Sequence, residues 1–209
     1  MKRKVTPTEL ALFSRSPVIG SWWEQLNKVD PRRAPKPKAD LLDQLLFESG
    51  HKHEEILIKD LESKGKKVKK LSGLMTDDAF QETLDVIHEG QYDYIHQASL
   101  QNDEIRGSAD LLERIYKPSK FGDWSYIPIE CKLSSHSKPI YLVQACAYCE
   151  LLEPILGNRP RNFKLYLGGK KFEREPDGYR LDDFWMWYKS LRDRYQKFLA
   201  AFDENQQPE

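Results

Sequence analysis

Hydrophobic positions along the chain alternate between helical and strand-like spacings, and this alternation predicts an α/β fold. The longest helical pattern spans about residues 40–64 and is followed by Gly65, a residue type that commonly terminates helices. Five residues with the spacing i, i+4, i+8, i+11 and i+15 form one face of this helix: Leu42, Leu46, Gly50, His53 and Leu57. We expect this face to point toward the core.

Two shorter helices are predicted before it. Thr6-Pro7-Thr8-Glu9 fits a capping box with proline at the first helical position. Ser16-Pro17 predicts a second helix start, from which Trp22, Trp23 and Leu26 would pack inward. The stretch 30–38 contains three prolines and four basic residues, so we expect a loop there.

The rest of the chain predicts a central sheet with flanking helices. Two strand-like runs are separated by a short polar turn and predict a hairpin. In chain order we expect a helix at 83–90, strands at 92–100, 105–115 and 124–133, a helix at 138–156, a strand at 163–167 and a helix at 182–202. The prediction is one domain over 1–209, with a mixed sheet of four to five strands. Residues 1–75 would form a helical N-terminal part carrying His53, and residues 76–209 an αβββαβ core with a closing helix.

Composition narrows the class of protein. Of 209 residues, 33 are Lys or Arg and 33 are Asp or Glu, so net charge predicts no general attraction to nucleic acid or membrane. The aromatic content of 11% argues against long disordered segments. Apolar runs are too short for a membrane span, and the basic N-terminus lacks the apolar stretch of a signal peptide. Three cysteines favour a reducing, cytoplasmic location.

Charged residues inside two predicted strands are the main candidates for chemistry. Strand alternation places Glu130 and Lys132 on one face and Cys131 on the other. Asp110 stands among small and apolar residues of the preceding strand. If these strands are neighbours, Asp110 and Glu130 converge, and two close carboxylates favour a shared hard cation such as Mg²⁺ or Mn²⁺. The alternative is an ordinary Glu130–Lys132 ion pair, with Asp110 capping a turn.

Two further polar residues lie on otherwise apolar helix faces. Gln144 shares a stripe with Tyr141, Tyr148 and Leu151, and a buried amide there would need partners, either the strand charges or a backbone group. His53 lies on the apolar face of the long helix, where it is either a metal ligand or a core histidine with its hydrogen bonds satisfied.

Taken together, these motifs resemble the PD-(D/E)xK nuclease superfamily, specifically its RecB-like branch, which includes the Cas4-type nucleases. The resemblance covers about residues 6–202. Nineteen residues separate Asp110 from the Glu130-x-Lys132 motif. The motifs are, in order, Gly50-x-x-His53-Glu54, Gly107-x-Ala109-Asp110, Ile129-Glu130-Cys131-Lys132 and Gln144-x-x-x-Tyr148.

The resemblance implies a restriction-endonuclease-like core and a Mg²⁺ or Mn²⁺ site. Its ligands would be Asp110, Glu130, the main-chain carbonyl of Cys131 and the imidazole of His53. Lys132 would orient or deprotonate the attacking water, or stabilise charge at phosphorus. Gln144 and Tyr148 would hold Lys132 or touch the DNA backbone. The implied activity is a metal-dependent deoxyribonuclease acting on single strands or ends with little sequence specificity, often joined to a helicase domain or subunit.

One departure concerns cysteine. Cas4-type relatives bind a 4Fe–4S cluster through four cysteines, whereas this chain has Cys131, Cys146 and Cys149, so we expect no iron–sulfur cluster. A catalytically silent nucleic-acid-binding or partner-docking module on the same fold remains the main alternative, and an accidental set of motif matches is another. Two basic clusters are candidates for phosphate contact or for a solvated surface: Arg32, Arg33, Lys36 and Lys38, and Lys64, Lys66, Lys67, Lys69 and Lys70.

Overall fold

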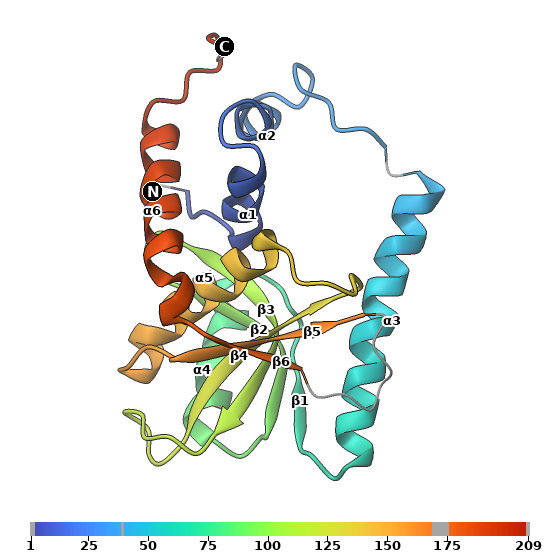
Figure 1. Ribbon diagram of the computed structural model, residues 1–209, viewed down its shortest axis with the longest axis vertical. Coiled ribbons are helices and arrows are strands. Elements are labelled where there is room, and N and C mark those ends of the chain that lie inside the picture. Colours follow the sequence, from blue (N-terminus) through green and yellow to red (C-terminus); the bar gives the residue numbers. More distant parts are fainter. Residues whose placement is uncertain (1–2, 39, 169–175, 208–209) are drawn as a thin grey trace.

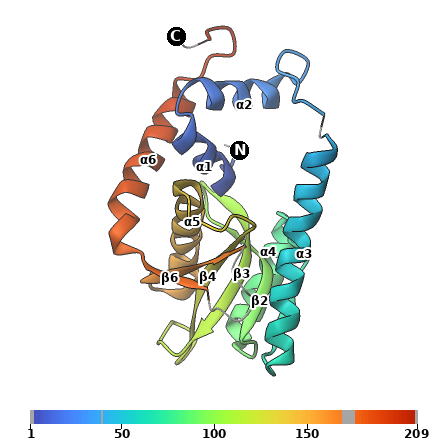
Figure 2. The ribbon, with the colours of Figure 1, turned by 45° about the vertical axis from the view of Figure 1, so that its right-hand side comes forward.

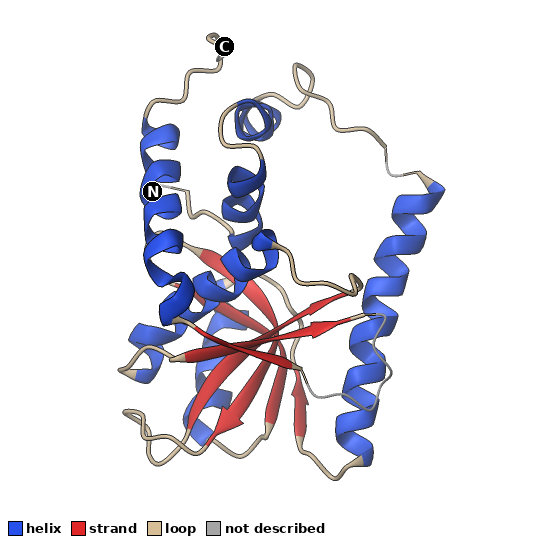
Figure 3. Cartoon of the chain, viewed as in Figure 1, coloured by secondary structure: helices blue, strands red, loops and turns tan. Residues whose placement is uncertain are grey.

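A mixed six-stranded sheet flanked by helices forms the centre of the molecule in the computed structural model, which describes residues 3–38, 40–168 and 176–207 (Figure 1, Figure 3). The strands are β1 (Val68–Lys70), β2 (Tyr94–Gln101), β3 (Arg106–Ile115), β4 (Ser125–Lys132), β5 (Asn162–Leu167) and β6 (Asp177–Arg180). The helices are α1 (Pro7–Arg15), α2 (Ile19–Val29), α3 (Leu41–Ser63), α4 (Asp77–Glu89), α5 (Pro139–Leu156) and α6 (Asp182–Ala200).

The strands lie in sequence order, from β1 to β6. β2, β3 and β4 form an antiparallel meander, whereas β1 pairs with β2 and β5 with β4 in parallel. α5 provides the crossover from β4 to β5, as a parallel connection requires. The predicted α/β class and hairpin are therefore confirmed.

The predicted count of four to five strands is wrong, because β6 pairs antiparallel with β5 as a sixth strand. Its four residues read Asp-Gly-Tyr-Arg, a composition more typical of a turn than of a strand. This segment is therefore a strand because it pairs with β5, and not because its residues favour the strand conformation.

The two faces of the sheet are covered by different helices. Leu112 packs in the main core with residues of α1, α4, α5 and α6, whereas its neighbour Leu111 belongs to a smaller cluster on the other face. That smaller cluster joins Leu57 of α3 to strands β3, β4 and β5. Because adjacent strand residues point to opposite faces, α3 covers one face and α5 the other.

Helix α3 has the predicted bounds but a different packing. Asp40 caps its first turn, and Gly65, in the left-handed region at φ +76°, follows its last turn. The prediction that Leu42 and Leu46 face the core is wrong, since they are 62% and 53% exposed, while Leu57 is buried. The N-terminal half of α3 extends beyond the strands (Figure 1, Figure 2), so none of the described strands lies beneath those leucines.

The remaining helix predictions differ mainly at their starts. The Thr6 capping box is present, but α2 begins at Ile19 rather than beside Pro17. Trp22 is buried as predicted, whereas Trp23 is 42% exposed. α4 begins at Asp77, earlier than predicted, because Thr76 caps it. Within the described residues, no helix is long and apolar enough to cross a membrane.

Candidate functional site

The acidic residues of β3 and β4 meet where the ladder between these two strands stops. Backbone pairing ends at Leu111 and Ile129, one step before Asp110 and Glu130. There the Asp110 side chain replaces the ladder, because its Oδ2 accepts the backbone N–H of Cys131 at 2.8 Å. The two strands therefore bring Asp110 to the last residues of β4.

Lys132 lies between the two acids. Its Nζ is 3.5 Å from Asp110 Oδ2 and forms an ion pair with Glu130 Oε1. The ammonium also lies over the ring of Tyr141, 5.8 Å from the centroid. A charged group thus already neutralises part of the negative charge at this end of the sheet.

Burial dominates the electrostatics of the cluster. Glu130 is 2% exposed, and its burial together with the nearby Asp110 charge raises its pKa to about 8. Burial also raises the pKa of Asp110, although the Lys132 ammonium acts in the opposite direction. Burial alone would lower the pKa of Lys132, but the two carboxylates raise it above its ordinary value. Two buried acids beside one ammonium leave this site with excess negative charge whenever both are ionised.

One oxygen of the cluster has no partner among the described residues. Glu130 Oε2 is buried and forms no hydrogen bond with any described residue. An unpaired buried carboxylate oxygen costs free energy, and most native structures satisfy such atoms. An additional cation bound at Glu130 would satisfy it, so the two carboxylates fit a hard divalent ion.

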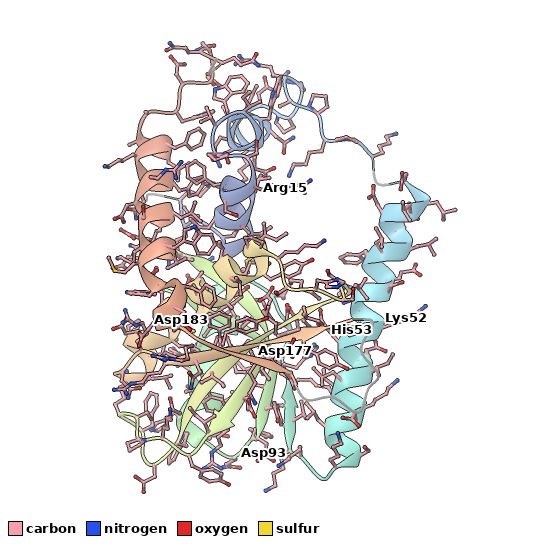
Figure 4. All side chains as sticks on the ribbon, viewed as in Figure 1. Arg15, Lys52, His53, Asp93, Asp177 and Asp183 are labelled. Carbon is pink, nitrogen blue, oxygen red and sulfur yellow. The ribbon has the colours of Figure 1, made fainter. Side chains whose placement is uncertain are left out.

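His53 approaches the sheet from α3. It lies on the side of the helix that faces the strands, whereas the adjacent Lys52 points away from them (Figure 4). Its ring stacks on Tyr166 of β5 at 4.6 Å between centroids, and burial lowers its pKa, which favours the neutral imidazole that metals bind. Its Nε2 is buried without a hydrogen-bond partner among the described residues.

A carboxylate beside His53 is part of the same site, and sequence reasoning gave it no role. Glu54 Oε2 accepts a hydrogen bond from Gln97 Nε2 at 2.8 Å and lies 3.2 Å from His96 Nε2. Its negative charge contributes to the raised pKa values of Asp110 and Glu130. The signal available in the sequence was the pair of adjacent polar residues, His96 and Gln97, in the middle of the predicted strand.

Gln144 and Tyr148 form hydrogen bonds with groups other than Lys132, although the pKa of Tyr148 is raised by burial and also by the charges of Glu130 and Asp110. The Gln144 amide donates to Thr8 Oγ1 at 3.5 Å, so its hydrogen bond goes to α1 and not to Lys132. Tyr148 is buried, and its hydroxyl donates to the backbone carbonyl of Ser108 at 2.6 Å. The tyrosine whose ring the Lys132 ammonium lies over is Tyr141, about two helical turns before Tyr148 on α5.

The cysteines are buried in the protein interior. Cys146 and Cys149 lie in the main core, while the Cys131 side chain points to the α3 face, away from Glu130. Burial raises the pKa of all three thiols, which keeps them protonated. This supports core packing as the role of the Cys146-x-x-Cys149 pair.

The candidate metal ligands do not form a closed set in the part of the chain that the structure describes. No three side chains among its Asp, Glu, His and Cys residues are grouped closely enough to hold an ion together. The physical reason is visible in the contacts of Lys132, whose ammonium occupies the space between Asp110 and Glu130.

Several residues of the two basic clusters are neutralised by neighbouring acids, so each cluster offers less free positive charge to a phosphate backbone than its sequence suggests. These ion pairs are Arg32–Asp30, Arg33–Glu204, Lys36–Glu24, Lys64–Asp60, Lys69–Glu82 and Lys70–Glu62. The sequence matches no protein-family model, and a search of curated proteins returned no significant match.

Proposed function

We propose that this protein is a divalent-metal-dependent nuclease that hydrolyses phosphodiester bonds of DNA. The observation that carries the proposal is the buried Glu130, one oxygen of which has no partner among the residues that the structure describes, and which lies beside Asp110 and Lys132 at the ends of adjacent strands. Asp-and-Glu-x-Lys on neighbouring strands is also the arrangement expected from the resemblance to PD-(D/E)xK nucleases. A restriction-endonuclease-like core is part of the same proposal, supported by the meander and the parallel crossover through α5.

The residues fit Mg²⁺ or Mn²⁺ because the available donors include hard carboxylate oxygens. Asp110, Glu130, the main-chain carbonyl of Cys131 and the neutral imidazole of His53 would hold the ion. A bound ion of this kind supplies a water of lowered pKa and offsets negative charge on a phosphate.

Lys132 is the residue that would change partners. Without the ion its ammonium pairs with Glu130 and approaches Asp110. If a cation neutralised the carboxylates, the Lys132 ammonium would be free to hold an attacking water or to stabilise the extra negative charge at phosphorus. Tyr141 keeps the lysine within reach, because its ring lies beneath the ammonium.

The substrate proposed is single-stranded DNA or DNA ends, with little sequence specificity, because no base-reading motif is present in the sequence. A helicase domain or subunit would supply such strands. Both the substrate and the helicase partner are proposed from the resemblance to RecB-like nucleases.

A catalytically silent DNA-binding or docking module is the second candidate. It is favoured by the ion pair between Lys132 and Glu130, which already neutralises the acid, and by the hydrogen bond of Gln144 to Thr8 in place of Lys132. In that case the acids and the lysine serve stability alone.

Labelled single- and double-stranded DNA incubated with Mn²⁺ or Mg²⁺ distinguishes the two. We expect cleavage that EDTA stops and that Asp110→Asn, Glu130→Gln and Lys132→Met each reduce by about 10²–10⁴-fold. Glu55→Gln is the matched control, since Glu55 is an exposed carboxylate of α3, 64% accessible and outside the cluster. Equal cleavage by the wild type and Glu130→Gln contradicts the nuclease, whereas salt-sensitive DNA binding without cleavage establishes the silent module.

A further inference from the structure

Gln97 has a backbone conformation that is unusual for its position. Within the described residues it is the one residue other than glycine with a positive φ, +56°, and it lies in the middle of strand β2. Residues with a Cβ enter this left-handed region at an energetic cost, and such residues concentrate at functional sites. The cost calls for a compensating contact, and the side chain of Gln97 makes two.

The left-handed conformation of Gln97 interrupts the pairing of β2 with β3 directly opposite Asp110. Backbone pairing joins His96 to Leu111 and Ala98 to Ala109, so Gln97 stands opposite Asp110 without forming a ladder pair. The alternation of β2 side chains between the two faces of the sheet also shifts by one residue at Gln97. Ile95 and Ala98 both belong to the main core, although strict alternation would place them on opposite faces.

This slip allows two consecutive side chains of β2 to reach the same atom of α3. In a regular strand, His96 and Gln97 would point to opposite faces. Here Gln97 Nε2 donates to Glu54 Oε2 at 2.8 Å, and His96 Nε2 lies 3.2 Å from that same oxygen. Gln97 Oε1 in turn accepts the hydroxyl of Ser108 on β3 at 3.1 Å. The amide therefore bridges α3 to the strand that carries Asp110.

Gly73 permits this arrangement. It has a φ of +68°, and a Cβ at this position would come within 2.8 Å of Gln97 Oε1. The absent side chain leaves room for the Gln97 amide between the loop after β1 and strand β3.

The bridge matters because, among the described residues, α3 has few attachments near His53 other than the stacking of His53 on Tyr166. Most side chains of α3 before His53 are exposed, and its buried apolar residues, Leu57 and Ile58, lie about one turn further along. The hydrogen bonds to Glu54 thus hold α3 one residue after His53, next to the contact of the His53 imidazole with the Tyr166 backbone, and together they fix the rotation of the helix at this point.

We propose that Gln97 is a positioning residue that holds α3 so that His53 stays against Tyr166, the register partner of Cys131, at the end of the sheet that carries Asp110 and Glu130. The proposal rests on the proposed function, because it assigns His53 to the metal site. Gln97 acts through Glu54 and Ser108 and touches neither the ion nor the DNA. Residues that orient metal ligands typically change affinity by about 10–100-fold when they are removed.

Mn²⁺ binding to the full chain without DNA, measured by electron paramagnetic resonance or calorimetry, tests this role. We expect Gln97→Gly, which accommodates the positive φ but lacks the amide, to weaken Mn²⁺ binding by about 10–100-fold. Gln97→Asn also tolerates the left-handed region, but its shorter amide cannot span Glu54 and Ser108, so we expect the same defect. Gln101→Gly is the matched control, a glutamine of the same strand whose hydrogen bonds go to Asp77, Lys4 and Arg106.

Hydrogen exchange gives a second readout that does not involve metal. Amides of residues 50–58 should exchange faster in Gln97→Gly than in the wild type, and at wild-type rates in Gln101→Gly. Wild-type Mn²⁺ affinity in both Gln97 variants overturns the positioning role while leaving the nuclease proposal intact. Absence of Mn²⁺ binding by the wild-type protein overturns the metal site, and the role of Gln97 with it.

Discussion

Replacing Glu130 by glutamine should change how the stability of the metal-free protein depends on pH. The carboxyl has a pKa of about 8 in the folded protein, against an ordinary value of 4.5. A folded state with the higher pKa binds more protons than the unfolded state between these values, so stability is present at low pH and falls as pH rises from about 4.5 to about 8. The amide introduced by Glu130→Gln does not titrate, so the substitution removes this dependence.

The magnitude follows from the same two values. For one group shifted from 4.5 to about 8, the free energy of unfolding falls by about 2 kcal/mol between about pH 6 and about pH 8. The wild type should therefore lose about 2 kcal/mol more than Glu130→Gln over this interval. The slope needs no separate correction for the Lys132 ion pair, because the pKa of about 8 already includes the attraction of the Lys132 ammonium to the ionised carboxylate.

Urea unfolding at several pH values in EDTA measures both slopes, and Glu55→Gln controls for the removal of one exposed carboxylate. Saturating Mn²⁺ should abolish the difference in slope, because a bound cation keeps Glu130 ionised. Parallel curves for the wild type and Glu130→Gln in EDTA would refute the buried, proton-binding Glu130 on which the site is built.

Three further predictions concern single contacts. Lys132→Met should destabilise the metal-free protein by about 3 kcal/mol at about pH 8, because it leaves two buried acids without a counter-ion, and by clearly less at acid pH; an equal loss at both pH values in urea unfolding argues against this cause. Leu57→Ala should cost about 2–5 kcal/mol, whereas Leu46→Ala should change stability by less than about 0.5 kcal/mol, because Leu57 is 5% and Leu46 53% exposed; similar costs in thermal unfolding would contradict the packing of α3. Tyr148→Phe should cost about 1 kcal/mol through the lost hydrogen bond to Ser108 while retaining Mn²⁺ binding, measured by calorimetry; loss of binding would return Tyr148 to the site.

Much of the fold follows from local signals in the sequence. The capping residues Thr6 and Asp40 and the glycines after α3 and α4 are local features, and the predicted helices end within a few residues of them. β6 could not be predicted in this way, because it depends on pairing with β5. The exposure of Leu42 and Leu46 could not be predicted either, because periodicity identifies an apolar helix face without showing whether other residues pack against it.

The candidate site also has a part that local sequence patterns predict and a part that depends on tertiary structure. Strand alternation placed Glu130 and Lys132 on one face, and Asp110 joins them because the two strands are neighbours, as the prediction required. The roles of Glu54 and Gln97 depend on a left-handed residue inside β2, which no local pattern predicts for glutamine. The partners of Gln144 and Tyr148 depend on where α1 and β3 pass over α5, which is a property of the tertiary structure.

A crystal of the wild-type protein grown with Mn²⁺, with data collected for anomalous scattering, tests the metal site most directly. We predict an anomalous peak between the carboxylates of Asp110 and Glu130, with Glu130 Oε2 as a ligand and the Lys132 ammonium displaced from its ion pair. A difference map without that peak, in which Lys132 still bridges both acids at saturating Mn²⁺, would contradict the account.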